Sequence, residues 1–476
     1  MASLAPAAPE NAVRTPRQIR LETVAEWSVG QPVGQLRAVP VTLGAGEEAV
    51  AVLYGADFDV DPFTEMFFFP ADTLKLALYT LRGELLWRKD LGKGVVPGLW
   101  FCPFLAFDLD GDGSDEIWFV DNVNVAHPLG ASGYRLARLN ARTGERTGEW
   151  AWPNFGSNAQ SLSHLFRNFL VGGYAGDERV LVTAQGTYGA MFLQGWDGGG
   201  DDLKTRWQTE IGKDSAGARG SHMCALADLD GDGVQEVLWG ERPIALDTGR
   251  ELFCADRETY RGHSDIVQPW LDRSDSSWHI YVCRESDTRA APRVLGYDAR
   301  GAREWGDVDH GHMDIGWVAR LGLPQTEYAA MSIRIGQKFC GPDGRWHTGT
   351  EQFAWDARVG TPTELLFDAY KTIPVDLDGD GFQEIVRGAA GGDGEVLTGS
   401  GGRIGSVGGA VAIAAKLLDA PGEQLLSYHE DGSVRIWADR NAEDSLVARE
   451  RYASRLYLAN RKLTGSGYNL TALAGL

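Results

Sequence analysis

The feature that most constrains the fold is a hairpin motif that recurs along the whole chain. In each copy an apolar strand runs into a Gly-rich turn, and a second strand follows that often ends in Trp. Clear copies are "LYTLRGELLW" ending at Trp87, "RLNARTGERTGEW" at Trp150, "LQGWDGGGDDLKTRW" at Trp207 and "LGYDARGAREW" at Trp305. With looser copies included there are eight hairpins, and another pair of apolar segments precedes each one. Such self-similarity at a regular spacing is typical of repeat folds.

Eight four-stranded units predict an all-β fold, a single β-propeller. Eight blades are favoured, with seven as the alternative, and a multi-domain β-sandwich protein explains the hairpin recurrence less well. We expect an N-terminal segment with a ring-closing strand at 1–36, the propeller at 37–442, and a C-terminal tail at 443–476 that packs on it.

Composition and charge exclude several classes of partner. The net charge of −21 argues against nucleic acid as the main partner. No apolar run approaches the roughly 18 residues of a membrane span. The five cysteines are an odd number without framework spacing, which indicates mostly reduced thiols. No apolar signal segment is visible at the start, so we expect a cytoplasmic protein; a secreted chain whose signal had been removed would look the same. The oligomeric state stays open.

Three near-identical acidic loops, each reading "DLDGDG" with a Glu three residues later, predict calcium sites. D-x-D-x-D-G is the start of an EF-hand loop, but here the Glu falls at position 9 and an apolar strand follows instead of a helix. Their repetition points to a structural role rather than to catalysis. The predicted ligands are Asp108, Asp110, Asp112 and Glu116, then Asp228, Asp230, Asp232 and Glu236, then Asp376, Asp378, Asp380 and Glu384. A weaker variant without the Gly is "DFDVDPFTE", from Asp57 to Glu65.

A second metal site is suggested by histidines in three consecutive segments, "RGHSDIV", "YVCRES" and "DHGHMD". These segments are expected at the same level of adjacent blades. Imidazole and thiolate groups are preferred zinc ligands. The candidate ligands are His263, Cys283, His310 and His312. The alternative is a set of hydrogen-bonded polar residues near the propeller axis.

The segments "GARGSHMCALADLDGDGVQEVLWG", "YRGHSDIVQPWL" and "YVCRE" resemble the rhamnogalacturonan lyases that have an eight-bladed propeller. "GTYGAMFLQGWD" and the tail "RLYLANRKLTGSGYN" are also similar to segments of that family, so the resemblance covers roughly residues 100–470. The family's Gly-His-Gly-Asp is "GHSD" here, and the His of its Val-His-Glu is Cys283. In the family that position helps to bind calcium, so a softer metal such as zinc is the expectation here. Without the family's extra N-terminal β domain, the chain is also similar to propeller lyases that act on ulvan or on rhamnose–glucuronate linkages.

The resemblance implies β-elimination at a 4-linked uronic acid in an acidic polysaccharide or oligosaccharide. That chemistry needs a group that neutralises the C6 carboxylate, a base for the C5 proton and an acid for the departing O4. Arg219 and His222 could bind the carboxylate, His164 or His127 could be the base, and Tyr188 could be the acid. Arg167, Tyr260 and Tyr468 are further candidates for substrate binding.

Two other functions fit the sequence. One is a non-catalytic calcium-dependent binding propeller, which would lack a site of convergent His and Tyr. The other is a glycoside hydrolase that removes rhamnose from glucuronate, for which Asp265, Asp309 and Asp314 are the available carboxylates outside the loops.

Overall fold

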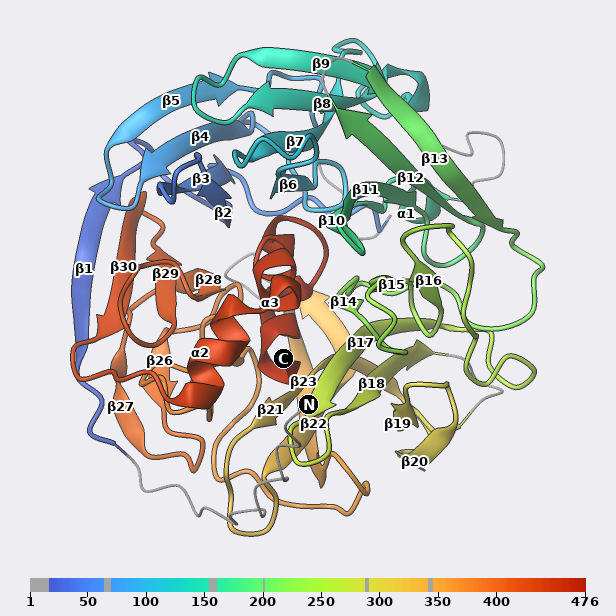
Figure 1. Cartoon of the computed structure of the whole chain (residues 1–476), viewed down its shortest axis with the longest axis vertical. Helices are drawn as coiled ribbons and strands as arrows, with labels where there is room; N and C mark the ends of the chain where they lie inside the picture. The colour runs from blue at the N-terminus through green and yellow to red at the C-terminus, as the bar shows by residue number, and fades with distance from the viewer. Residues whose placement is uncertain (1–16, 64–69, 154–160, 200–201, 287–290, 341–345) are drawn as a thin grey trace, which may run out of the picture.

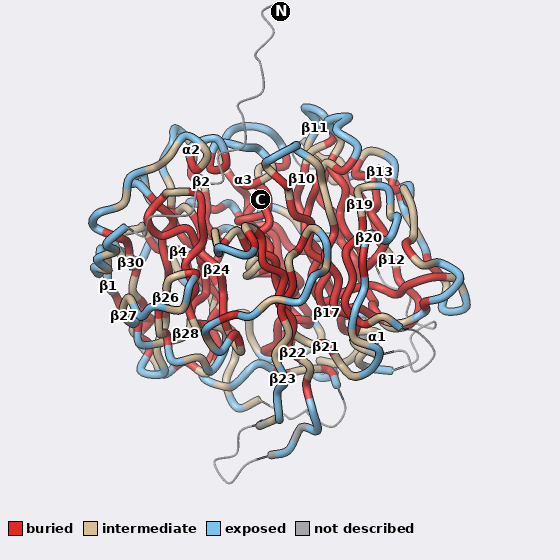
Figure 2. Tube along the Cα trace, turned by 90° about the horizontal axis from the view of Figure 1, so that it is seen from below, coloured by how far each residue is buried: buried red, intermediate tan, exposed pale blue. Residues whose placement is uncertain are grey.

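The computed structural model describes residues 17–63, 70–153, 161–199, 202–286, 291–340 and 346–476. Within these residues the strands form eight antiparallel sheets arranged in a ring (Figure 1). Seen from the side, the ring is a thick disc whose strands are largely buried and whose loops are exposed (Figure 2). The predicted eight-bladed, all-β propeller is confirmed.

In most sheets the strands follow one another outward from the centre in chain order, because short turns join antiparallel neighbours. Blade 1 holds β2 (Gln35–Thr42), β3 (Glu48–Gly55), β4 (Lys75–Thr80) and β5 (Leu85–Asp90). Blade 2 holds β6 (Phe104–Phe107), β7 (Glu116–Asn122), β8 (Tyr134–Asn140) and β9 (Arg146–Ala151). Blade 3 holds β10 (Asn168–Ala175), β11 (Glu178–Gln185), β12 (Met191–Gly199) and β13 (Asp202–Ile211). Blade 4 holds β14 (Leu226–Ala227), β15 (Glu236–Leu238) and β16 (Pro243–Ala245).

The second half of the ring repeats this arrangement. Blade 5 holds β17 (His263–Asp272), β18 (Ser277–Ser286), β19 (Val294–Asp298) and β20 (Arg303–Asp307). Blade 6 holds β21 (His312–Arg320), β22 (Tyr328–Cys340) and β23 (Trp346–Asp356). Blade 7 holds β24 (Ile373–Val375), β25 (Glu384–Val386), β26 (Glu395–Leu397) and β27 (Arg403–Ser406). Isolated bridges, Ile244 to Glu251 and Trp355 to Pro362, stand where blades 4 and 6 would have a fourth strand.

Blade 8 is built from both parts of the chain. It holds β28 (Ala410–Ala415), β29 (Gln424–Tyr428), β30 (Ser433–Asp439) and, outermost, β1 (Leu21–Ser28). β1 pairs antiparallel with β30 from Leu21 opposite Asp439 to Ser28 opposite Ser433. This pairing closes the ring by joining the two ends of the propeller in one sheet.

The C-terminal segment fills the centre of the ring (Figure 1). It comprises α2 (Leu446–Ala453), α3 (Arg455–Asn460), η3 (Leu463–Gly465) and η4 (Asn469–Gly475), while η1 (Ala131–Gly133) and α1 (Leu162–Leu165) lie in loops of the ring. Asn460 exchanges two hydrogen bonds with the backbone of Leu226, at 2.9 and 3.0 Å, and the Asn469 Oδ1 atom accepts one from the Cys224 amide. These side chains satisfy inner-strand backbone groups that a neighbouring strand does not reach. Across the described part of the chain, no helix is long and apolar enough to cross a membrane.

Three tryptophans of the repeated hairpin join blade 1 to blade 2, blade 3 to blade 4 and blade 5 to blade 6. The indole Nε1–H of Trp87 donates to the Ala141 carbonyl, that of Trp207 to Leu246 and that of Trp305 to Ala357, at 2.7, 2.7 and 2.9 Å. Each acceptor lies beside the hairpin turn of the following blade. The turn glycine of that blade then packs directly on the indole: a Cβ atom added at Gly249 would lie 2.4 Å from the Trp207 ring. The Trp and Gly of the sequence repeat are therefore the two halves of one inter-blade contact.

Replacing Gly249 by alanine should destabilise the protein by roughly 3 kcal/mol, because the added methyl group meets the Trp207 ring and the residue has a left-handed φ of +67°. Gly92→Ala is the matched control, since Gly92 has a φ of +77° but nothing within 4 Å of the added atom. Gly92→Ala should destabilise the protein by only about 1 kcal/mol, the cost of a left-handed φ in a residue that has a Cβ atom. Urea unfolding of the two variants would check this, and equal losses would contradict the role given to the tryptophan contact.

Candidate functional site

The candidate site lies where the chain enters the innermost strands of blades 2 to 6. Trp100 precedes β6, Arg167 precedes β10, His222 precedes β14, and His263 and His312 begin β17 and β21. The acidic loops follow β6, β14 and β24, so they lie at the opposite ends of these innermost strands. The site and the acidic loops therefore lie on opposite faces of the disc.

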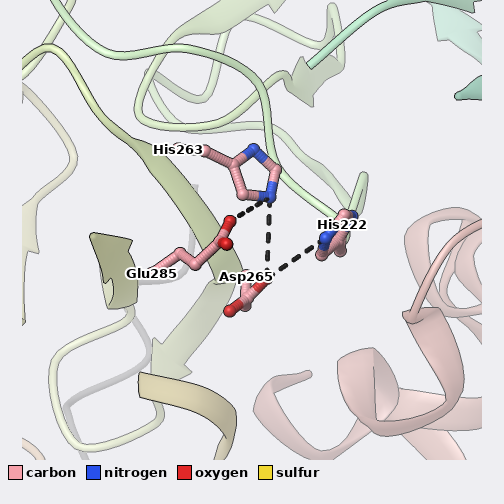
Figure 3. Close-up of side chains that lie close together, drawn as sticks. All are labelled: His222, His263, Asp265 and Glu285. Atoms are coloured by element: carbon pink, nitrogen blue, oxygen red, sulfur yellow. Dashed lines mark ion pairs between the residues drawn. The ribbon is translucent and has the colours of Figure 1, made fainter. Parts of the chain in front are cut away.

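Four side chains form the centre of the site: His222, His263, Asp265 and Glu285 (Figure 3). One ligand atom from each lies within 4.8 Å of the others. The Asp265 Oδ1 atom is 3.3 Å from His222 Nε2 and 3.6 Å from His263 Nε2, and Glu285 Oε2 is 3.9 Å from His263 Nε2. Two register shifts between β17 and β18, on either side of Ser264, leave Asp265 and Glu285 without cross-strand partners. This local irregularity is what brings both carboxylates to one point.

The atoms of this centre fit a divalent cation. His263 Nδ1 lies 2.7 Å from the Thr187 hydroxyl and 3.1 Å from the Thr187 carbonyl. A proton on Nδ1, donated to that carbonyl, would leave the Nε2 lone pair to a cation. His263 Nε2, Asp265 Oδ1 and Glu285 Oε2 are all buried and without a hydrogen-bond partner. Converging unpaired acceptor atoms are costly unless a cation binds them. An imidazole fixed by a backbone carbonyl is the usual arrangement of a metal ligand.

A second carboxylate group extends the centre toward blade 6. His312 Nε2 lies 3.0 Å from Asp265 Oδ2 and 3.2 Å from Asp314 Oδ1. Although burial alone would lower it, these two carboxylates raise the pKa of His312 to about 10. Burial would raise the pKa of Asp265, but the imidazoles of His263 and His312 outweigh it and hold that pKa below its ordinary value. Asp265 is therefore a carboxylate shared between two halves of the site.

Tyr188 lies between this centre and His164. Its hydroxyl is 3.1 Å from His222 Nε2, and its ring stacks against His164 with centroids 5.6 Å apart. Burial and the charge on Glu285 raise the pKa of Tyr188 well above its ordinary value, so the phenol is neutral at neutral pH. Burial and Arg167 lower the pKa of His164, whose Nδ1 atom has no hydrogen-bond partner. A neutral phenol and a neutral imidazole thus stand side by side, as an acid and a base for proton transfer would.

The floor of the site is aromatic and carries one guanidinium. Arg167 lies over the Trp100 ring at 4.7 Å and over the Tyr188 ring at 5.5 Å. Its Nη2 atom is 3.1 Å from Asp61 Oδ1, which comes from blade 1. Tyr468, from the C-terminal segment, packs on Trp100 and His222 and is 39% exposed. Arg167 and Tyr468, both predicted as substrate-binding residues, are thus brought to the site.

Two members of the predicted zinc quartet lie elsewhere. The Cys283 thiol is buried and donates to Ser332 Oγ at 3.3 Å, and burial raises its pKa to about 12, so it is not a thiolate. His310 is exposed on the rim, paired with Asp309 and 3.3 Å from the Arg334 guanidinium. The grouping of His263, Cys283, His310 and His312 is therefore wrong as a set: His263 and His312 approach the same Asp265, and carboxylates take the places given to the other two.

Three predicted catalytic or binding residues are placed away from the centre. Arg219 extends into its own loop, where Nη2 donates to the carbonyls of Lys213 and Ser215 at 2.9 and 2.5 Å. Tyr260 is fully buried and donates to the His263 carbonyl at 2.5 Å, so it supports the site from behind rather than meeting a substrate. His127 is exposed in the loop after β7, where its backbone amide donates to Asn124 Oδ1.

Several residues of the site are not among those predicted for it from the sequence. Glu285 lies two positions after the predicted ligand Cys283, and Asp265 is predicted only as a possible carboxylate of a glycoside hydrolase. Asp61 belongs to the weaker acidic segment "DFDVDPFTE", whose Asp57 and Asp61 accept hydrogen bonds from neighbouring backbone amides. Glu65 lies outside the described residues. The segment ties blade 1 to Arg167 instead of forming a fourth acidic loop of the predicted kind.

The acidic loops have the same conformation in blades 2, 4 and 7. In each, the Glu at position 9 accepts a hydrogen bond from the second residue of the loop: Glu116 from Leu109, Glu236 from Leu229 and Glu384 from Leu377, at 2.8–3.0 Å. The clustered carboxylates are Asp108, Asp110 and Glu116; Asp228, Asp230 and Asp232; and Asp376, Asp378 and Glu384. Of the three remaining predicted ligands, Asp112 and Asp380 accept backbone hydrogen bonds within their loops, and Glu236 accepts the one from Leu229.

The loop carboxylates fit bound cations. Burial, assisted by Asp110, raises the pKa of Glu116 to about 8, and burial with Asp230 does the same for Glu236. Burial and Glu423 raise the pKa of Asp376 to about 7. Asp228 Oδ1 and Asp376 Oδ1 are buried without a hydrogen-bond partner. Hard oxygen ligands clustered in this way are the coordination that Ca²⁺ prefers.

Comparison with known proteins agrees with this geometry. Residues 168–322, which carry Tyr188 and all four residues of the centre, match the family model of the C-terminal domain of rhamnogalacturonan lyase family 11. The chain is a relative of the rhamnogalacturonan lyases of family 11. The rhamnogalacturonan exolyase YesX of Bacillus subtilis is 28% identical over 344 residues, covering 61% of this chain and 55% of that protein. The endolyase YesW of the same organism is 26% identical over 373 residues, covering 65% and 58%.

The solved structures of this family share the fold. A Bacillus licheniformis rhamnogalacturonan lyase superposes with a TM-score of 0.74 over 95% of this chain and 81% of that chain, at 17% identity. The exotype lyase YesX gives 0.72 over 93% and 80%, at 19% identity. The chain spans little more than half the length of the curated relatives that it matches.

Proposed function

We propose that the protein is a polysaccharide lyase that cleaves an acidic polysaccharide or oligosaccharide of rhamnose and uronic acid by β-elimination. The observation that carries the proposal is the Tyr188 hydroxyl, which lies 3.1 Å from His222 and beside His164, next to the unpaired ligand atoms of His263, Asp265 and Glu285. The family relationship of residues 168–322 supports the same reaction class.

The residues of the site divide among the three requirements of the reaction. A divalent cation held by His222, His263, Asp265 and Glu285 would supply positive charge that neutralises a uronate carboxylate. Arg167 adds a fixed positive charge under Tyr188. Neutral His164 takes the C5 proton, and the Tyr188 phenol gives its proton to the departing O4. Because Tyr188 and His164 are partly exposed while His222 and His263 are buried, the sugar meets the first pair directly.

The three acidic loops are proposed to bind Ca²⁺ and to stiffen blades 2, 4 and 7 from the opposite face. They carry no step of the reaction. The loops thus keep the structural role that the sequence predicts. For the second metal site, near His263, we propose carboxylate ligands in place of the predicted Cys283 thiolate.

The proposal is tested by incubating the protein with a rhamnogalacturonan backbone, ulvan and homogalacturonan. The expected product carries the ultraviolet absorbance of a conjugated unsaturated uronate, and its mass lacks the water that hydrolysis would add. A saturated, hydrated product would show a glycoside hydrolase instead. Binding of the polymers without any cleavage would favour a binding propeller.

A further inference from the structure

A buried carboxylate from the neighbouring blade lies directly behind the candidate metal centre. Glu241, in the link between β15 and β16 of blade 4, has no solvent-exposed side chain, and it pairs with Arg284, whose side chain is 1% exposed. The pair is bidentate: Arg284 Nε donates to Glu241 Oε1 at 2.9 Å, and Nη2 donates to Oε2 at 2.7 Å. The fork geometry of such a pair fixes both side chains in position and in angle.

Glu241 also holds the strand that faces β18. The Ser264 hydroxyl donates to Glu241 Oε1 at 2.9 Å, and the Tyr297 hydroxyl lies 2.9 Å from Oε2. Ser264 stands between His263 and Asp265, and Arg284 immediately precedes Glu285. Ser264 and Arg284 are opposite each other in the β17–β18 register, at the point where that register is interrupted on both sides. One carboxylate therefore binds the immediate neighbours of three of the four candidate ligands.

Tyr260 completes this support. Its ring lies 3.7 Å from the Arg284 guanidinium, and its hydroxyl donates to the His263 carbonyl at 2.5 Å. Asp256 provides a second acceptor for Arg284 Nη2 at 2.9 Å. The ladder to β18 is interrupted at this stretch of β17, which is held by backbone bonds of Ser264 with Gly220 and His222 and by these side-chain contacts.

We propose that Glu241 is a positioning residue for the metal centre: through Ser264 and Arg284 it sets the spacing of His263, Asp265 and Glu285, and thereby the affinity for a divalent cation. It touches neither substrate nor cation. This role rests on the proposed metal-assisted function of the site, but it is measured by binding rather than by turnover. Partners behind metal ligands typically change affinity by about 10–100-fold when they are removed.

The test uses the full chain in excess Ca²⁺, so that the acidic loops are saturated, and titrates Zn²⁺ or Mn²⁺ calorimetrically. Removing one partner of a buried ion pair can prevent folding, so the main variant is the double change Glu241→Leu with Arg284→Met, which removes both charges. Glu241→Gln is the second variant, because it keeps an oxygen acceptor for Ser264. We expect the cation affinity of the double variant to be about 10–100-fold below that of the wild type, and the affinity of Glu241→Gln to fall by less.

Asp272→Asn with Arg358→Met is the matched control. This ion pair also joins β17 to a neighbouring blade, but it lies at the far end of the strand, where Arg358 Nη2 donates to Asp272 Oδ1 at 2.8 Å. It should lower stability and leave cation affinity unchanged. A folded Glu241 variant with wild-type affinity would overturn the proposal, as would a wild-type protein that binds neither ion. Failure of the proposed lyase function would be seen separately. The wild-type protein would then form no unsaturated product, although replacing Glu241 would still lower its cation affinity.

Discussion

Replacing Tyr188 by phenylalanine should lower kcat on the cleaved polymer by about 10²–10⁴-fold, the usual contribution of a positioned acid or base. The variant loses only the hydroxyl that lies 3.1 Å from His222 Nε2, while its ring can keep the contacts with His164 and His263. KM should change little, because the hydroxyl acts on the departing oxygen rather than holding the chain. Initial rates of unsaturated-product formation, with circular dichroism as a check on folding, measure the effect.

Tyr174→Phe is the control for that experiment, since Tyr174 packs on Phe107 near the acidic loops at the other end of the innermost strands. It should retain full activity. His164→Ala should resemble Tyr188→Phe if His164 is the base. If Tyr188→Phe keeps wild-type turnover, the assignment of the acid is wrong. If only His164→Ala keeps it, the base lies elsewhere.

Removing Ca²⁺ with a chelator should lower the melting temperature by about 10 °C or more. A ligand at 1,000 times its Kd stabilises the folded state by about 4 kcal/mol, and three loops would each contribute such a term. Without a cation the loops must hold carboxylates at close range, as in the group formed by Asp376, Asp378 and Glu384. Thermal unfolding followed with and without chelator, and after Ca²⁺ is restored, gives the measurement.

Single-loop variants separate the three contributions. Asp230→Asn should reduce the calcium stoichiometry by one and lower the melting temperature by part of the total. Asp177→Asn is the control, because Asp177 is an exposed acid close to the same loop face but outside the loops. A melting temperature that does not respond to chelation, together with metal analysis that finds no calcium, would contradict the calcium interpretation of the loops.

The propeller could be predicted from sequence because its decisive contacts are local and repeated. The Trp that ends a hairpin and the Gly of the next turn recur at each of several blades, so their pattern is visible along the chain. The blade number follows from counting the eight hairpins, with or without the tryptophan. The central position of the C-terminal segment was not visible, because Asn460 and Asn469 reach it through backbone groups of Leu226 and Cys224 that leave no mark in the sequence.

The candidate site was predicted only in part, for reasons that are equally physical. His222, Tyr188, His164 and Arg167 were predicted because the implied β-elimination needs such groups and these residues lie between the expected strands. Arg219 was misplaced because nothing in "ARGSH" shows that its guanidinium is bound by the carbonyls of Lys213 and Ser215. Cys283 was predicted because it stands where the related family has the His of its Val-His-Glu, and Glu285 was not among the predicted ligands. The register shifts beside Ser264 are what bring Asp265 and Glu285 together, and such shifts cannot be read from residue types.

The closing sheet of blade 8 has a consequence for the synthesis of the protein. β1 is made long before its partner β30: Glu26 and Arg435, which pair across them, are 409 positions apart. β1 must therefore wait as an unpaired strand while seven blades are made. Its charged residues Glu22 and Glu26 are the kind that keep a free edge from pairing with other chains. The ring can close only after β30 has been made, so pairing of β1 is the late step in folding of the propeller.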